Sequence, residues 1–493
     1  MADLTGGQLV ARTLRGAGVR HVFTLCGGHI LPIFDGCLTE DVGIIDVRHE
    51  QAAAHAGDAY ARLTRGVGVA IVVPGPGVTD AVTGVANAYA ARSPLLLIGG
   101  AAPLGLRGLG ALQETEQVAL LKPITKGAWS VAETRQIPEV LATAIRTALA
   151  GRPGPVFVEI PVDLLLTTVE ERLAPIPTGY VHRTRGAADA DALAGLEALV
   201  GGAERPVVIA GGGVYWDDAA KSLATFAERS GVPVFMNGAG RGALATDHPN
   251  AFFQTRGWAL GHADVVLVLG TPLDFRLGYG RPPTFAEGAK VAMIDVDPVE
   301  LGRNRPLELG LAGDLDVILR QLTDALPKGL AGRVAPWGTE LRRREGEARA
   351  KLEELAATDQ VPVSHVAKLL RPDQRVLLVS GDGAFGLNGM ELETAVRFGL
   401  PFTCIIGNDG GWGQIRSPQV SFFGEARTVA TSLPTTRYDR MVEALGGRGA
   451  FITDPREIGP ALTRALASDE VWCLNVVLDP EAYRKSGQVS MAI

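Results

Sequence analysis

GDGAFGLNGMELETAVRFGLPFTCIIGNDG, residues 381–410, constrains the fold more tightly than any other stretch of the chain. It follows the apolar run RVLLVS (375–380) and contains a second apolar run, PFTCIIG (401–407). Between the two runs lies the stretch from Met390 to Phe398. Leu392 and Val396 within it, and Leu400 just after it, have helical spacing. The stretch therefore predicts a strand, a tight turn, a helix and a second strand.

Polar residues follow both apolar runs. Asp382 comes after the first run and Asn408 after the second, so both are expected at the carboxyl ends of neighbouring parallel strands, where ligands bind in α/β folds. One carboxylate, one amide oxygen and the Gly410 carbonyl suit Mg²⁺, and Gly383 lets backbone amides approach phosphates. The alternative is an ordinary glycine turn and a loop dipeptide; the pairing of both motifs favours a metal and phosphate site.

Composition excludes several classes of function. With 493 residues, 46% of them hydrophobic, the chain is too long for one core, and its net charge of −7 gives no basic surface for nucleic acid or an anionic membrane. No apolar stretch reaches the roughly 18 residues of a membrane span, and the first residues have no signal-peptide core. The four cysteines form no CxxC pair, so we expect no structural zinc, no disulfide framework and a cytoplasmic location.

Short apolar runs alternate with helical patterns along the whole chain. Ten such runs predict an α/β fold with parallel sheets. Two linkers rich in Pro and Gly, residues 175–191 and 327–338, divide the chain into three Rossmann-like domains. We place these domains at 1–174, 190–326 and 355–493.

A second group of candidate residues lies in the N-terminal domain. Residues 43–100 predict, in order, strand, Arg-His-Glu, helix, strand, Gly-Pro-Gly turn, helix and strand. Glu50 begins the alanine-rich first helix. By itself, such a glutamate most often complements the helix dipole.

The motifs together resemble those of a known family. RHEQAAAHAGDAYAR (48–62), the Gly-Pro-Gly turn (75–77) and the stretch 381–410 are similar to thiamine-diphosphate enzymes of the acetolactate synthase and 2-hydroxyacyl-CoA lyase (oxalyl-CoA decarboxylase-like) group. The resemblance implies pyrimidine-binding, central and diphosphate-binding domains, thiamine diphosphate and Mg²⁺ as cofactors, and a homodimer or homotetramer acting on a small molecule. It also makes Glu50 the catalytic glutamate, whose carboxyl group holds a proton at N1′ of the aminopyrimidine.

The resemblance extends over nearly the whole chain. FTLCGGHILPIFDG (23–36) places Cys26 and His29 near the reactive face of the cofactor, and GALQETEQVALLKPITK (110–126) points Gln113 into the site. A lone histidine is more often a loop residue, so the catalytic role of His29 depends on the likeness. The resemblance further implies cofactor contacts from Gly27, Gly28, Gly75, Pro76, Gly77, Asn87, Gly381, Gly383, Ala384, Met390 and Trp412.

Two chemistries divide the group. Synthases join two 2-keto acids and usually carry FAD in the central domain, whereas lyases hold an ADP or CoA moiety there and cleave 2-hydroxyacyl-CoA to formyl-CoA and an aldehyde or ketone. GTPLDFRLGYG (270–280) is closer to the lyase form, so we favour the lyase and disfavour FAD. Acetolactate synthase and a non-catalytic relative remain alternatives, and Asp295 and Asp297 predict either a ribose contact or a simple turn.

The chain departs from the family pattern in two places. The family normally carries a further strand, helix and glycine-rich loop before the GDG motif, roughly 50 to 60 residues, and no such unit fits near 365–370. Either the 493-residue sequence omits this stretch or the protein lacks it; we favour omission, because a true deletion would leave an unfilled sheet edge. The spacing from Asp382 to Asn408 is also one residue short, which leaves open a one-residue slip of the Asn-Asp-Gly loop.

Overall fold

A computed structural model describes residues 3–181, 185–356, 376–413, 416, 419–420 and 424–479. The predicted break near 365–370 lies outside these residues. The chain forms two compact units, residues 1–44 with 54–350 and residues 45–53 with 351–493, and each is described by itself. Among the described residues, no helix is both long and apolar enough to cross a membrane.

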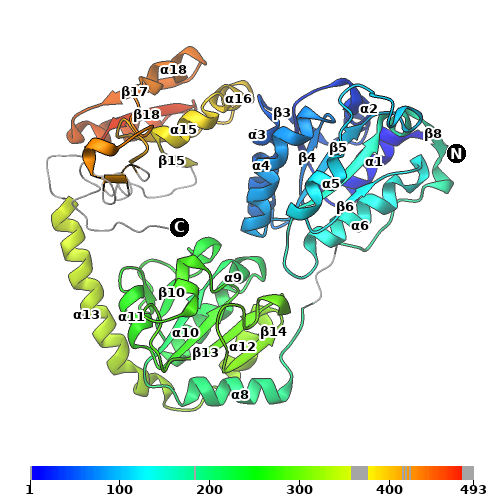
Figure 1. Cartoon of the computed structure of the whole chain (residues 1–493). Helices are drawn as coiled ribbons and strands as arrows, with labels where there is room; N and C mark the ends of the chain where they lie inside the picture. The colour runs from blue at the N-terminus through cyan, green and yellow to red at the C-terminus, as the bar shows by residue number, and fades with distance from the viewer. Residues whose placement is uncertain are drawn as a thin grey trace. The chain divides into compact units, whose positions relative to one another are not determined.

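The first sheet has six strands in the order β3-β2-β4-β5-β7-β6 (Figure 1). Its inner strands β4 (Gly68–Val72), β5 (Leu95–Ala101) and β7 (Val156–Pro161) are buried along their whole length. Strands buried on both faces are typical of parallel sheets covered by helices. The other elements are β2 (His21–Thr24), β3 (Gly43–Asp46), β6 (Ala128–Ser130), α1 (Gly6–Gly16), α2 (Leu31–Thr39), α3 (Glu50–Thr64), α4 (Pro76–Ala91), α5 (Gln117–Leu121) and α6 (Ile137–Leu149).

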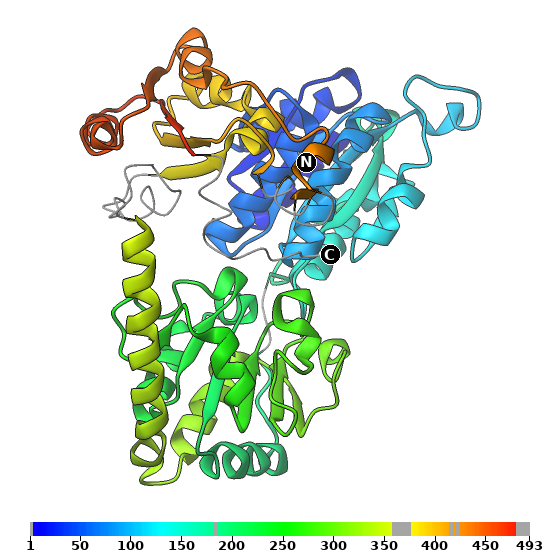
Figure 2. The same cartoon turned by 60° about the vertical axis from the view of Figure 1, so that its left-hand side comes forward.

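The second sheet also has six strands, in the order β11-β10-β9-β12-β13-β14, and all its pairs are parallel. The long helix α13 (Leu330–Ala356) runs along this domain (Figures 1 and 2), where the Glu345 carboxylate accepts the amides of Phe253, Gln254 and Thr255. The strands are β9 (Pro206–Ala210), β10 (Val234–Met236), β11 (Ala251–Phe252), β12 (Val265–Leu269), β13 (Lys290–Asp295) and β14 (Leu309–Ala312).

The third sheet has only four strands in the described part of the chain, in the order β15-β16-β18-β17. They are β15 (Leu377–Gly381), β16 (Thr403–Asn408), β17 (Arg448–Ile452) and β18 (Trp472–Val477), all parallel. Gly381 pairs with Gly407, so the prediction that residues 382 and 408 lie at the carboxyl ends of neighbouring parallel strands is confirmed.

The segment between β15 and β16 differs from the prediction in detail. The pattern predicted a tight turn and one helix, whereas α15 (Asp382–Asn388) begins directly after β15 and α16 (Glu391–Arg397) follows it. Gly381 keeps an extended conformation, so the strand enters the helix without a separate turn. The ten predicted strands and the α/β class with parallel sheets are otherwise confirmed.

Candidate functional site

The candidate residues of the N-terminal domain depend on glycines that lie very close to neighbouring side chains at the carboxyl ends of β4 and β5. A Cβ atom at Gly27 would lie 2.2 Å from Val73 Cγ1, and one at Gly100 would lie 2.9 Å from the Cβ of His29. Only glycine allows these approaches, so His29 is seated directly on β5. His29 is half-buried, and this burial lowers its pKa.

The Gly-Pro-Gly turn contacts the segment that carries Gln113. Gly75 has a φ of +61° and precedes α4, which begins at Pro76. A Cβ atom at Gly75 would lie 2.6 Å from the carbonyl oxygen of Gln113, so the Gln113 backbone rests on this glycine. Gln113 itself has a φ of 61°, a conformation that non-glycine residues adopt rarely.

Gln117 connects these two contact points, and sequence reasoning missed it. Its buried side chain accepts the Gly75 amide at 3.3 Å and donates to the Gly100 carbonyl at 2.7 Å. One amide group thus holds together the glycines that seat Gln113 and His29. The sequence signal that could have identified Gln117 was a polar residue at the position where a short helix begins to pack on the sheet.

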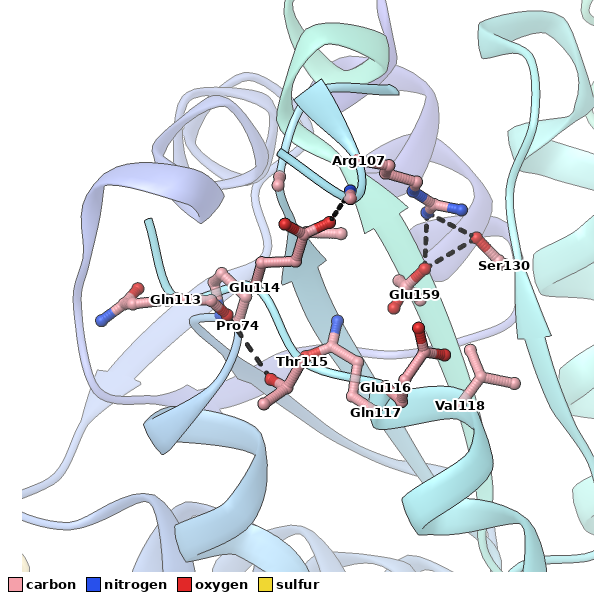
Figure 3. Close-up of a pocket in the computed structure, with 13 residues that line it drawn as sticks. Pro74, Arg107, Gln113, Glu114, Thr115, Glu116, Gln117, Val118, Ser130 and Glu159 are labelled. Carbon is pink, nitrogen blue, oxygen red and sulfur yellow. Dashed lines mark hydrogen bonds and ion pairs between the residues drawn. The ribbon is translucent and has the colours of Figure 1, made fainter. Parts of the chain in front are cut away.

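A cavity of about 470 Å³ opens beside this cluster (Figure 3). Arg107 Nη2 donates to Ser130 Oγ at 2.9 Å and to Glu159 Oε1 at 2.6 Å on one wall. Glu114 accepts three loop amides, which lower its pKa, and the side chain of Gln113 points away from the Arg107 group in Figure 3. One wall of the cavity is therefore polar and is held in shape by the ion pair of Arg107 and Glu159.

Two further predicted residues lie on helices. Glu50 is the first residue of α3 and is buried, as a glutamate facing a cofactor would be. Asn87 on α4 donates its side-chain amide to Asp58 Oδ2 at 2.9 Å, and Arg62 donates to the same carboxylate. The Asn87 side chain therefore joins α4 to α3, and the structure gives no separate support for its predicted cofactor contact.

The candidate residues of the C-terminal domain include two neighbouring carboxyl groups. Asp382 is buried and accepts the Gly411 amide at 3.1 Å through Oδ2. Asp409 lies beside it: burial first, and then hydrogen bonding and charge repulsion from Asp382, raise the pKa of Asp409 to about 6. Sequence reasoning did not assign a role to Asp409. Two adjacent oxygen donors that repel each other form a natural site for a hard divalent cation.

Asn408 and Gly410, the other predicted ligands, are engaged with protein groups. Asn408 Nδ2 donates to the Thr436 carbonyl and to Asn475 Oδ1, both at 3.0 Å, and its Oδ1 accepts the Gly410 amide at 3.3 Å. The Gly410 carbonyl accepts the Leu433 amide at 2.7 Å. These bonds favour the one-residue slip that the spacing left open, in which Asp409 replaces Asn408.

Gly383 lies against Trp412, so the structure brings two predicted cofactor contacts together. A Cβ atom at Gly383 would lie 2.8 Å from the Trp412 ring, and the Trp412 amide is held by the Thr431 carbonyl at 2.8 Å. Ala384 and Met390 are exposed. The oxygen donors of Asp382 and Asp409, which lie beside this contact, therefore fit Mg²⁺ and a diphosphate.

In the central domain, the structure shows how Asp295 and Asp297 are used. Asp295 is buried and accepts Arg92 Nη1 at 3.1 Å and the Asp297 amide at 3.0 Å. The Asp297 side chain accepts the Val299 amide at 3.1 Å. Both carboxylates support the chain itself here, as the turn alternative predicted.

Comparison with known proteins agrees with the geometry of both halves. Residues 4–120, 193–322 and 358–476 match the N-terminal TPP-binding, central and C-terminal TPP-binding domains of thiamine pyrophosphate enzymes. The chain is 34% identical over 538 residues to the acetolactate synthase large subunit of Mycobacterium tuberculosis, covering 96% of each chain. It is 32% identical over 566 residues to 2-hydroxyacyl-CoA lyase 2 of Bos taurus, covering 95% of this chain and 88% of the relative.

The alignment to the mycobacterial relative also measures a difference in length. It runs over 538 positions, whereas 96% of this 493-residue chain is only about 473 residues. About 65 aligned positions therefore have no counterpart here. The three matched domains and both relatives show that the chain belongs to the thiamine-diphosphate-dependent enzymes that include acetolactate synthase and 2-hydroxyacyl-CoA lyase.

Proposed function

We propose that the protein is a thiamine-diphosphate- and Mg²⁺-dependent carbon–carbon lyase that converts 2-hydroxyacyl-CoA to formyl-CoA and an aldehyde or ketone. The observation that carries the cofactor assignment is the pair Asp382 and Asp409 beside the contact of Gly383 with Trp412. The choice of the lyase is supported by GTPLDFRLGYG (270–280) and by the relatives named 2-hydroxyacyl-CoA lyase 2.

Each group of residues has a separate task in this proposal. Asp382 and Asp409 supply oxygen ligands to Mg²⁺, and Gly383 lets the Trp412 ring pack directly against the backbone beside this metal pair. Glu50 holds a proton at N1′ of the aminopyrimidine, while His29 and Gln113 line the reaction chamber. Thiamine diphosphate, when bound, supplies a group that stabilises the negative charge left on carbon as a carbon–carbon bond breaks.

The reaction is tested by offering two substrates to the purified protein with thiamine diphosphate and Mg²⁺. Formyl-CoA and an aldehyde or ketone from a short 2-hydroxyacyl-CoA, identified by mass spectrometry, are expected. Acetolactate from pyruvate would instead move the protein to the synthase branch, to which the 34% identical relatives are assigned by name. No product from either substrate and no thermal stabilisation by the cofactors would support a non-catalytic relative.

The metal ligand is tested by two neighbouring substitutions. Asp409→Ala should raise the Mg²⁺ concentration needed for half-maximal activity by at least about tenfold, because it removes a charged ligand. Asn408→Ala should mainly lower the melting temperature, since it removes the hydrogen bonds to Thr436 and Asn475. The reverse pattern would return the amide ligand to Asn408.

A further inference from the structure

The loop of residues 102–116, between β5 and α5, carries Gln113 but buries few of its side chains. Leu106, Leu109 and Leu112 are 48%, 75% and 74% exposed in this chain. Apart from one short turn of 3-10 helix, Leu104–Leu106, the loop has no regular secondary structure. Because apolar burial holds so little of this loop, its order must come from polar contacts.

The Glu114 carboxylate supplies these contacts (Figure 3). Its Oε1 accepts the Gly108 amide at 2.6 Å, and its Oε2 accepts the amides of Gly110 and Ala111, both at 3.2 Å. The bond from Gly108, followed by those from Ala111 and Gly110, lowers the pKa of Glu114, so the group is ionised at neutral pH. Hydrogen bonds to a charged acceptor are stronger than those to a neutral one. One side chain therefore fixes the backbone of four consecutive residues.

Two glycines of the loop make this arrangement possible. Gly108 and Gly110 have φ values of +77° and +76°, in the left-handed region that glycine adopts at little cost. Such residues turn nearby amides toward a common point, and the concave group of N–H donors that results binds an anion. In the loop of residues 102–116, the anion is the chain's own Glu114 carboxylate.

Gln113 lies in the tight turn that brings Glu114 back to these amides. The Glu114 amide donates to the Ala111 carbonyl at 3.1 Å, so residues 111–114 form a turn with Gln113 at its third position. Gln113 has a φ of 61° there, and a positive φ at this position of a turn usually requires glycine or asparagine. The chain therefore keeps a glutamine where that residue is conformationally disfavoured, which is typical of functional sites.

We propose that Glu114 is a positioning residue that holds Gln113 in this left-handed conformation. Both Glu114 oxygens accept backbone amides, so the side chain acts through the loop and not on a substrate. On its other side, the Gln113 backbone rests on Gly75, whose Cβ position would lie 2.6 Å from the Gln113 carbonyl oxygen. Held from both sides, the Gln113 side chain points away from the Arg107 group (Figure 3). This role rests on the proposed function, in which Gln113 lines the reaction chamber.

A double-mutant cycle tests whether Glu114 acts through Gln113. Glu114→Ala should lower kcat/KM by about tenfold, while the same change in a Gln113→Ala background should lower it by less than about twofold. The melting temperature should fall equally in both backgrounds. Glu114→Gln, which keeps one acceptor oxygen, should show a smaller loss of the same kind and replaces the alanine variant if that variant does not fold. An equal loss of kcat/KM in both backgrounds would contradict the proposal, because a loop that only stabilises the fold affects both alike.

Glu345→Ala is the matched control. Glu345 also accepts three consecutive amides, those of Phe253, Gln254 and Thr255 at 2.9–3.1 Å, but in the central domain. Its substitution should lower the melting temperature and leave kcat/KM unchanged. A loss of kcat/KM equal to that of Glu114→Ala would assign the effect to general stability and overturn the positioning role.

A second measurement does not need turnover. Trypsin is added to the native full chain, and cleavage after Arg107, just before the bonded segment, is followed by mass spectrometry. Glu114→Ala should be cleaved there at least about fivefold faster than the wild type, because cleavage follows the population of the opened loop. Glu345→Ala, which controls for lower global stability, should match the wild type.

The two measurements separate this inference from the proposed function. Equal cleavage rates for Glu114→Ala and the wild type would mean that the carboxylate does not hold the loop, whatever the activity. If the wild type turned over neither substrate, the proposed function would fail, while faster cleavage of Glu114→Ala would still show that Glu114 holds the backbone around Gln113.

Discussion

The N-terminal and C-terminal cofactor domains share one architecture but differ in how completely it is built. The N-terminal sheet has six strands, and three of its inner strands, β4, β5 and β7, are buried along their whole length. The described C-terminal sheet has four, and the strand that leads to Asp382 is its edge. Among the described residues, the half that would hold the aminopyrimidine is therefore built from more strands than the half that would hold the diphosphate.

This difference indicates which residues affect the chemical step and which affect how tightly the cofactor is bound. The contacts that seat His29 and Gln113 lie within a well-packed domain, so the chamber residues have fixed positions without the C-terminal half. Asp382 accepts an amide of the loop that follows β16, but β15 has no second neighbour among the described residues. We expect substitutions in the first domain to affect turnover and those in the second to affect cofactor affinity.

The largest effect is expected from Glu50→Gln. Glutamine keeps the shape but cannot exchange a proton with the aminopyrimidine, so turnover should fall by about 10²- to 10⁴-fold. Thermal stabilisation by thiamine diphosphate and Mg²⁺ should remain. The control is Glu139→Gln, another glutamate in the first turn of a helix, which should retain full activity. Unchanged turnover in Glu50→Gln would remove this residue from its proposed role.

Gly383→Ala should weaken cofactor binding by the C-terminal domain. The new methyl group would lie 2.8 Å from the Trp412 ring, and overpacking of this kind costs about 1–3 kcal/mol. In a thermal-shift measurement, the rise in melting temperature that thiamine diphosphate causes should decrease. This decrease should be larger than the drop in melting temperature of the free protein.

Gly386→Ala is the matched control for that substitution. Gly386 lies in the same helix and has open space around its Cβ position. Alanine there should stabilise the helix by about 0.5–1 kcal/mol and leave cofactor binding unchanged. Equal losses of binding in both variants would contradict a specific role for the contact between Gly383 and Trp412.

Gln117→Leu tests the packing of the N-terminal domain. The substitution leaves the Gly75 amide and the Gly100 carbonyl without their buried partner, at a cost of about 1–3 kcal/mol. Because these glycines seat Gln113 and His29, kcat should fall along with the melting temperature, while the cofactor concentration for half-maximal activity stays constant.

Gln321→Leu provides a control with similar lost bonds. Gln321 also bridges two backbone groups, accepting the Ala188 amide at 3.0 Å and donating to the Ala188 carbonyl at 3.3 Å, but in the central domain. It should lower the melting temperature without lowering kcat. If both variants lose kcat equally, Gln117 stabilises the fold without positioning the site.

Much of this arrangement follows from sequence, and the remainder depends on tertiary contacts. Apolar runs ending in glycine predicted the strands and put residues 382 and 408 side by side, because parallel register follows from strand length and turn position. The choice between Asn408 and Asp409 could not be made, since a one-residue slip reverses which side chain faces Asp382. Gln117 was missed because its two partners, Gly75 in the Gly-Pro-Gly turn and Gly100 in β5, lie far from it in the sequence.

The smallest effect concerns the stability of the metal-free C-terminal half. The pKa of Asp409 is raised from 3.8 to about 6, by burial and then by Asp382, so the folded state keeps a proton that the unfolded chain releases between these pH values. Stability from this group is therefore greatest at low pH and is lost as pH rises through about 6. Discounting for partial exposure, the loss is on the order of 1–2 kcal/mol.

Mg²⁺ should remove this penalty by neutralising the two carboxylates. The rise in melting temperature on adding Mg²⁺ with thiamine diphosphate should accordingly be larger at pH 7.5 than at pH 5. Other groups titrate in the same range, so the informative quantity is the difference between the wild type and Asp409→Asn, which has no proton to exchange there. If the difference between the wild type and Asp409→Asn does not change between pH 5 and 7.5, the two carboxylates do not compete for one proton. The metal affinity of the C-terminal domain would then come from Asp382 alone.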